Sequence, residues 1–153
     1  MGFFDGYNVS TSGMSAQRTR INVVSANIAN AKTTHTDEGG PYKKQQVVFE
    51  DVLVNQTNKT NNNDIETNNN RNSANELRGV GVKSILDSQA SPVLRFEPNH
   101  PDANEEGYVA YPDINPVVEM VDLIEAMRSY EANVAAFNTH KNIDSKTLGI
   151  LEV

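Results

Sequence analysis

Three histidines are the only side chains of this chain that could exchange protons near neutral pH or offer an imidazole to a metal ion. His35 lies close to Asp37, and His100 lies close to Asp102, so each neighbourhood could form a carboxylate and imidazole site. Neither pair has the i, i+4 helical spacing that presents two ligands together, and turns gather these residue types for conformational reasons. A metal-dependent hydrolase that uses His35 and His100 therefore ranks last among the functional hypotheses.

Two other sequence patterns resemble functional sites, a phosphate-binding loop and a pair of catalytic carboxylates, but both have structural explanations. Residues 79–84 superficially resemble a phosphate loop, but they lack both the third glycine of the dinucleotide fingerprint and the Gly-Lys pair of the nucleotide loop. The acidic residues Glu119, Asp122, Glu125 and Glu131 lie on a predicted helix, where they indicate a solvent-facing or partner-facing acidic strip rather than paired catalytic carboxylates. We expect no enzyme activity, no catalytic site, no metal and no cofactor.

Composition narrows the classes of function further. The chain has 153 residues, a formal net charge of −7 and only 37% hydrophobic residues, so it can build one small core but is a poor candidate for nucleic-acid binding. It contains no cysteine, which excludes disulfides and thiolate metal sites. No apolar run approaches the roughly 18 residues of a membrane span, and the N-terminus lacks the pattern of a secretory signal. We expect neither a membrane-spanning segment nor a small-molecule substrate.

A long amphipathic helix near the C-terminus is the first of the predicted elements that would position any site. Asn115-Pro116 is a typical helix start, since Asn caps the free amides of the first turn and Pro needs no partner there. A helix from Pro116 to Leu148 would be about 50 Å long, which is more than a small domain can cover. Its apolar stripe follows the three-and-four spacing of a coiled-coil seam and consists of Met120, Leu123, Met127, Tyr130, Val134 and Phe137, resuming at Leu148 and Leu151.

The N-terminal segment carries a matching stripe. Its members Tyr7, Met14, Ile21 and Ile28 lie seven residues apart, and Ser10, Gln17, Val24 and Ala31 fill the intervening heptad positions. Half of this seam is polar or small, so the segment should gain its order from neighbouring helices. Two explanations stay open at this point: an ordinary helical hairpin within one chain, or assembly of many chains through both stripes.

The middle of the chain predicts short strands at residues 46–54, 80–86, 92–96 and 108–111. The first two could pair as a hairpin with a long loop. Residues 55–76 are rich in Asn and poor in apolar side chains, which predicts a disordered insertion. The expected fold class is α+β, with a coiled-coil-like helical assembly domain made by residues 1–34 and 113–153 and a small β-rich module at residues 35–112.

Short motifs mark both ends of the chain. At the N-terminus these are residues 12–18 (SGMSAQR) and 24–31 (VSANIANA). At the C-terminus they are residues 107–115 (GYVAYPDIN), 126–133 (AMRSYEAN) and 146–149 (KTLG). Together these motifs resemble the bacterial flagellar rod and hook proteins, and the short length favours a proximal-rod member. The Asn-rich stretch is the one departure, since it is longer than the usual connection in this family.

The resemblance implies a non-catalytic subunit that is exported unfolded by the flagellar type III apparatus, without a cleavable signal peptide. It would polymerise with itself and other rod subunits, next to membrane-ring and export-gate components, into the periplasmic drive shaft. The residues expected at the assembly interface are Tyr7, Met14, Ile21, Val24, Asn27, Ile28, Asn30, Met120, Leu123, Met127, Tyr130, Val134, Phe137 and Leu148.

Within that interface, Asn27 and Asn30 could hydrogen-bond across helices and fix their register. The competing hypothesis is a cytoplasmic helical adaptor or export chaperone that binds a partner helix in an exposed seam.

Overall fold

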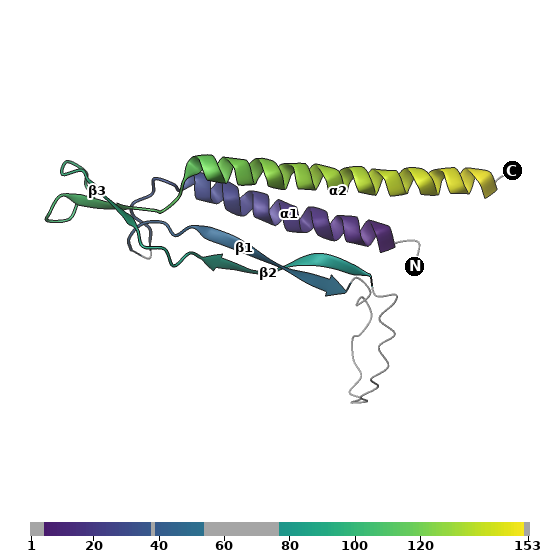
Figure 1. Ribbon diagram of the computed structural model, residues 1–153, viewed down its shortest axis with the longest axis horizontal. Helices are drawn as coiled ribbons and strands as arrows, with labels where there is room; N and C mark the ends of the chain where they lie inside the picture. Colours follow the sequence, from purple (N-terminus) through teal and green to yellow (C-terminus); the bar gives the residue numbers. More distant parts are fainter. Residues whose placement is uncertain (1–4, 38, 54–76, 152–153) are drawn as a thin grey trace, which may run out of the picture.

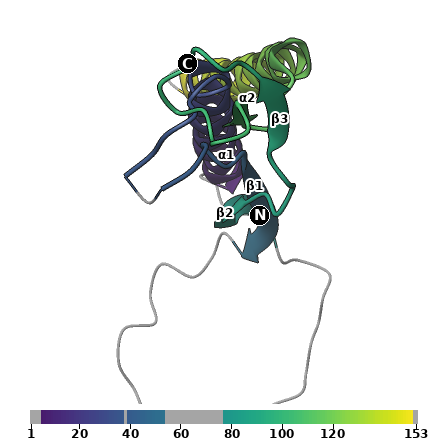
Figure 2. The same cartoon turned by 90° about the vertical axis from the view of Figure 1, so that its left-hand side faces the viewer.

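The computed structural model describes residues 5–37, 39–53 and 77–151, and arranges them as two helices and two small antiparallel sheets. The elements follow in the order α1 (Asp5–Ala29), β1 (Gln45–Leu53), β2 (Arg78–Asp87), β3 (Val93–Phe96), β4 (Tyr108–Tyr111) and α2 (Pro116–Leu151). Figures 1 and 2 show α1 in a middle layer, with α2 along one side of it and the β1–β2 ribbon along the other. The molecule is therefore elongated, and α1 is the element that joins its layers.

α2 begins where its capping residues predict. The Asn115 side-chain oxygen accepts a hydrogen bond from the Val117 amide at 3.0 Å, and the Asn115 carbonyl accepts one from the Glu119 amide at 3.1 Å. Pro116 occupies the first helical position, where its missing amide hydrogen costs nothing. The helix then runs for 36 residues without a break, a length of about 54 Å.

α1 ends in a turn that uses Asn30 as its cap. The Asn30 amide and the Asn30 side-chain Nδ2 both donate to the Ala26 carbonyl at 3.0 Å, and the Asn30 carbonyl accepts from the Thr33 amide at 3.0 Å. These bonds satisfy carbonyl groups that the end of a helix leaves without intrahelical partners. The chain then turns back toward β1.

The ribbon formed by β1 and β2 is antiparallel, with Gln45 opposite Asp87 at one end and Leu53 opposite Arg78 at the other. Its register shifts between Val48 and Phe49, as a β-bulge does. The ribbon packs on α1, where the Ser12 hydroxyl accepts a hydrogen bond from the Val80 amide at 3.2 Å. β3 and β4 form the second antiparallel pair, from Val93 opposite Tyr111 to Phe96 opposite Tyr108.

The core is small because most helix contacts use short side chains. Its buried hydrophobic residues among those described are Ala16, Val23, Val24, Val109 and Ala126. Within the three described stretches, no helix is both long enough and apolar enough to cross a bilayer.

The sequence-based prediction of an α+β fold is confirmed, and so is the pairing of the first two strands. Two observed bounds differ by a few residues: α1 ends at Ala29, before the predicted end at residue 34, and α2 begins at Pro116 rather than at residue 113. Residues 1–4 and 152–153 lie outside the described residues. β2 is longer than expected, starting at Arg78 and ending at Asp87. The Asn-rich stretch at residues 55–76 lies outside the described residues, and the division into an assembly domain and a β module stays a prediction.

Candidate assembly interface

α1 and α2 run antiparallel, and three contacts between them are spaced by seven and then fourteen residues along both helices. A Cβ atom added to Gly6 would lie 2.8 Å from the His140 ring, and one added to Gly13 would lie 2.6 Å from Asn133 Oδ1. Fourteen residues beyond Gly13, Asn27 bonds Glu119. Gly13 is therefore a position where the absence of a side chain lets the two helices approach.

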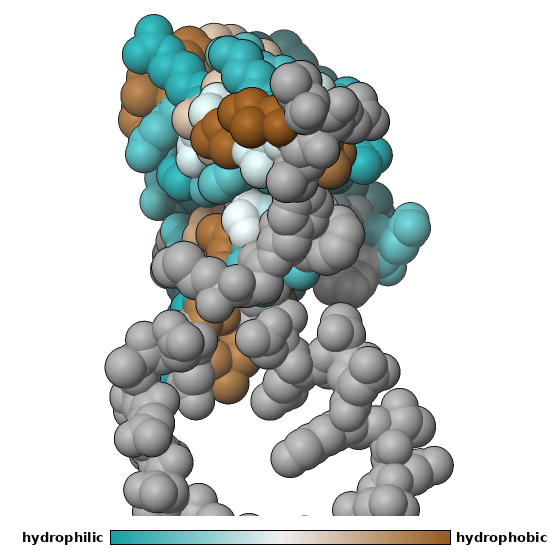
Figure 3. Space-filling model, turned by 90° about the vertical axis from the view of Figure 1, so that its right-hand side faces the viewer, coloured by the Kyte–Doolittle hydropathy of each residue, from teal (hydrophilic) through white to brown (hydrophobic). Residues whose placement is uncertain are grey.

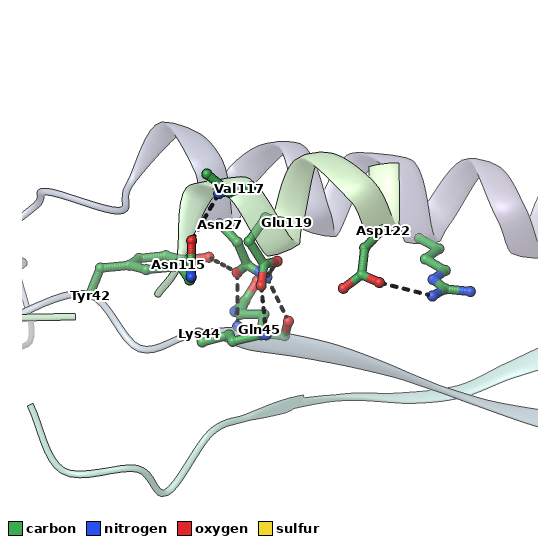
Figure 4. A network of polar contacts seen from close by, with 9 residues as sticks. Asn27, Tyr42, Lys44, Gln45, Asn115, Val117, Glu119 and Asp122 are labelled. Atoms are coloured by element: carbon green, nitrogen blue, oxygen red, sulfur yellow. Dashed lines mark hydrogen bonds and ion pairs between the residues drawn. The ribbon is translucent and has the colours of Figure 1, made fainter. Parts of the chain in front are cut away.

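Asn27 is the centre of a polar network that ties three segments together (Figure 4). Its side-chain Nδ2 donates to the Gln45 carbonyl at 2.9 Å and to Glu119 Oε2 at 3.0 Å. Its Oδ1 accepts from the Gln45 amide at 2.9 Å and from the Tyr42 hydroxyl at 3.2 Å. Both donors and both acceptor positions of this amide are thus filled, and the side chain is 1% exposed.

Glu119 supplies the charged part of the network. Its side chain is 1% exposed, and its Oε1 lies 2.6 Å from Lys44 Nζ. The expectation of a solvent-facing or partner-facing acidic strip is therefore wrong for Glu119, because its carboxylate is buried within the chain, where Lys44 and Asn27 replace the water that it loses. Glu125 and Glu131 are exposed as expected. Removing one partner from a buried ion pair leaves an uncompensated charge, so Glu119 and Lys44 depend on each other.

Two further charged or ionisable groups lie close to this network. Burial raises the pKa of the Tyr42 hydroxyl above its ordinary value of 10.0, and the nearby carboxylates of Asp87 and Glu119 raise it further. Arg20 lies 3.8 Å from Asp122, but both side chains are partly exposed, so this ion pair contributes little. The network is consequently held by its buried members.

A second cluster holds the other end of the helix pair. The Tyr7 hydroxyl donates to Asp144 Oδ2 at 2.5 Å, and this hydrogen bond raises the pKa of Tyr7 above its ordinary value of 10.0. The Tyr7 ring meets the Phe137 ring edge-on, with 5.0 Å between the ring centroids. Tyr7 therefore joins α2 through both its ring and its hydroxyl.

The predicted interface residues divide into three groups by exposure. Val24 and Asn27 are buried in the single chain, and Met120, Met127 and Leu148 are exposed. The remaining residues are half-buried, and they are Tyr7, Met14, Ile21, Ile28, Asn30, Leu123, Tyr130, Val134 and Phe137. Within the single chain Asn27 bonds Glu119 on α2, whereas among the described residues the Asn30 side chain bonds Ala26 and Thr33 in its own segment. The role of both residues in fixing register between subunits stays a prediction.

The closest contacts between the helices fall one residue before the apolar stripes read from the sequence. Gly6 and Gly13 precede Tyr7 and Met14, and Ala126 precedes Met127 in the same way. Sequence reasoning also missed Tyr42, Lys44 and Gln45, and no local pattern marks them as partners of the helices.

The side of α2 that faces away from α1 is apolar and open over its first turns. Its members follow the helical spacing of one continuous face, and all of them are exposed: Val117, Met120, Val121, Ile124 and Met127. We call this set the outer face of α2. One side of α2 is thus covered within the chain, as a helical hairpin requires, and the other side is not covered by any described residue. Assembly of many chains through the open side stays a prediction.

The residues that could do chemistry do not come together. His35 is exposed, and His100 accepts a hydrogen bond from the Asp102 amide through Nδ1 at 3.1 Å, as in an ordinary turn. Across the described ranges, no group of three His, Asp or Glu side chains could hold a metal ion. Residues 79–84 form part of β2.

Comparison with known proteins bears directly on this arrangement of paired terminal helices. Residues 8–34 match the family described as "Flagella basal body rod protein", and residues 105–150 match "Flagellar basal body rod FlgEFG protein C-terminal". The chain is 38% identical to the flagellar basal-body rod protein FlgC of Borreliella burgdorferi over 99% of both chains. It is 39% identical to FlgC of Bacillus subtilis over 96% of this chain and 97% of that one. Against FlgC of Salmonella typhimurium the identity is 35%, over 97% of both.

The chain belongs to the FlgC family of flagellar basal-body rod proteins. It is a structural subunit of the flagellar basal-body rod, as the resemblance of its two ends implied. The matched ranges include most of α1 and nearly all of α2, so the family matches fall largely on the helix pair described above. The adaptor and chaperone hypothesis is not favoured by these relatives.

Proposed function

We propose that this FlgC-family chain assembles into the rod through its terminal helices, and that the outer face of α2 is buried against neighbouring subunits. The observation that carries the proposal is the exposure of five large apolar side chains on one face of a helix whose opposite face is already packed. Water-exposed apolar faces of this size are typical of protein interfaces. Each fully buried side chain of this kind stabilises an interface by about 1.5–3 kcal/mol, and partly exposed ones by less.

The finer parts of the proposal rest on family membership. The chain is taken to be a non-catalytic proximal-rod subunit, exported unfolded through the flagellar type III apparatus without a cleavable signal, and located in the periplasm between the membrane ring and the hook. Its partners would be other copies, other rod subunits, and ring and export-gate components. The helix pair (residues 1–34 and 113–153) would be the coiled-coil-like assembly domain, an interpretation supported by the seven-residue recurrence of the α1–α2 contacts.

The interface residues proposed from the sequence fit two roles in this scheme. The buried and half-buried ones, such as Val24, Asn27 and Phe137, hold α1 against α2 within a subunit. The exposed ones, Met120 and Met127, contribute to the contact between subunits. Heterologous contacts that do not close into a ring give an open helical shaft.

A matched pair of substitutions tests the outer face. Ile124→Glu places a charge on the outer face of α2, whereas Asn22→Glu places the same charge at an exposed polar position of α1. In cells that lack the native protein, I124E should be missing from purified basal bodies and should fail to restore swimming, while N22E should restore both. Urea unfolding of the purified variants should show the same midpoint as the original chain. Normal incorporation and swimming with I124E would contradict the proposal.

A further inference from the structure

Two methionines lie together on the outer face of α2. Because the chain contains no cysteine, its four methionines hold all of its sulfur. Met120 and Met127 are seven residues apart, about two turns of the helix, and they are 52% and 47% exposed. Met14 on α1 is half-buried, and Met1 lies outside the described residues. Among the described residues, the most accessible sulfur therefore lies on the face that we propose contacts neighbouring subunits.

The other members of the outer face are aliphatic. They are Val117, Val121 and Ile124, and each is more than half exposed. In the end-on view of Figure 3, apolar side chains reach the surface at the top of the molecule, where α2 lies. No member of the face carries a charge or a hydrogen-bond donor, so any contact that this face makes depends on apolar burial. A polar group introduced there would lose water on burial without gaining a partner from its own face.

We propose that Met120 and Met127 form a paired oxidation site that controls whether the outer face of α2 can be buried. The oxidant is hydrogen peroxide, which transfers one oxygen atom to the thioether sulfur. The O–O bond breaks, an S–O bond forms, the sulfur gives up two electrons and the peroxide leaves as water. The resulting sulfoxide is polar and holds water that the thioether does not. This inference rests on the proposed function and adds a chemical regulation of the same surface.

Oxidation at these two positions leaves the anchors between α1 and α2 untouched. The residues next to the two methionines are Glu119, which bonds Asn27 on α1, and Ala126, which is completely buried. The oxidised chain therefore stays folded while its outer face becomes polar, in contrast to oxidation of a core methionine, which disrupts packing. The change is reversible, since a sulfoxide reductase that draws two electrons from a dithiol removes the oxygen as water.

Peroxide treatment of the purified full-length chain tests the site directly. Dilute hydrogen peroxide should oxidise Met120 and Met127 several-fold faster than Met14, as measured by mass spectrometry of peptides. The oxidised chain should leave a hydrophobic-interaction column earlier than the untreated chain, and its urea midpoint should stay the same. The matched control is Met120→Leu with Met127→Leu, which removes both sulfur atoms and keeps the face apolar. Peroxide should not change the column retention of this control.

The effect on assembly is tested with glutamine in place of methionine sulfoxide. Met120→Gln with Met127→Gln keeps the length of each side chain and adds a polar carbonyl group. In cells that lack the native protein, the amount of this variant in purified basal bodies should fall several-fold. The matched control is Ser15→Gln with Asn22→Gln, which places the same two amides seven residues apart at exposed positions of α1. This control should be incorporated like the original chain.

Three results would overturn the inference. These are oxidation of Met14 as fast as that of Met120 and Met127, an oxidised chain with unchanged column retention, and incorporation of M120Q/M127Q at the level of the α1 control. The I124E variant separates this inference from the proposed function. If M120Q/M127Q is incorporated and I124E is excluded from basal bodies, the oxidation site is rejected and the proposed function stands. If both variants are incorporated, the proposed function is rejected as well.

Discussion

Asn27→Ala is the substitution that should damage this fold most for its size. The change removes four hydrogen bonds at once and leaves Glu119 Oε2, the Gln45 amide and the Gln45 carbonyl without their partner. A buried polar group without a partner costs about 1–3 kcal/mol. Glu119 is 1% exposed, so the loss of its hydrogen bond should have the full cost. Gln45 is half-buried, so water can replace part of its lost hydrogen bonding and the cost there should be smaller. The expected loss in the free energy of unfolding is about 3–5 kcal/mol.

Urea unfolding followed by circular dichroism measures this loss. With an m-value of about 1.5 kcal/mol/M, the midpoint should fall by roughly 2–3 M. Asn30→Ala is the matched control, because the Asn30 side chain bonds only its own segment, and it should cost about 1 kcal/mol.

A smaller change in the same network keeps the test informative if N27A does not fold. Glu119→Gln preserves the shape of the side chain but can accept from only one of Asn27 and Lys44, because its amide nitrogen must then face the other donor. The loss in the free energy of unfolding for E119Q should therefore be larger than that for N30A and smaller than that for N27A. The reasoning is refuted if N27A loses no more stability than N30A, since Asn27 would then not be the centre of the network.

Two further predictions concern the helix pair and the network. Gly13→Ala should destabilise the chain by about 1–2 kcal/mol despite the better helix propensity of Ala, because its Cβ would lie 2.6 Å from an Asn133 amide that is held by the Ser129 carbonyl. Gly6→Ala should cost less, since the exposed His140 ring can move aside, and equal unfolding midpoints for the two variants would contradict this account. Because the folded state raises the pKa of Tyr42 above 10.0, the neutral hydroxyl stabilises the fold at lower pH, and stability should fall as the pH rises from about 10 toward the raised pKa. Tyr42→Phe should flatten that fall in a series of urea midpoints measured from pH 8 to pH 11, and an unchanged slope would assign it to other groups.

Local signals in the sequence predicted the local features well. The start of α2 was evident from Asn115 and Pro116, because capping depends only on neighbouring residues. The strands near Val47 and Val82 were evident from β-branched residues and the glycines that flank them. Asn30 is harder to interpret from local signals, since an Asn can either cap a helix end or bond across helices, and in the single chain its side chain bonds Ala26 and Thr33.

The seam between the helices was harder to predict because it is made of small residues. Counting large apolar side chains selects Met14 and Met127, whereas the closest approach occurs at Gly13 and beside Ala126. The burial of Glu119 depends on Lys44, which lies far away in the sequence and on another element. Nothing near position 119 distinguishes a buried carboxylate with a lysine partner from a carboxylate in water.

The bond between Asn27 and Glu119 spans 92 positions of the sequence, and the bond between Tyr7 and Asp144 spans 137. The native state therefore closes on itself only when its last helix is free to meet its first. While the C-terminal segment is still being synthesised, α1 lacks the contacts with α2 that stabilise it. The order of α1 therefore depends on the completion of α2.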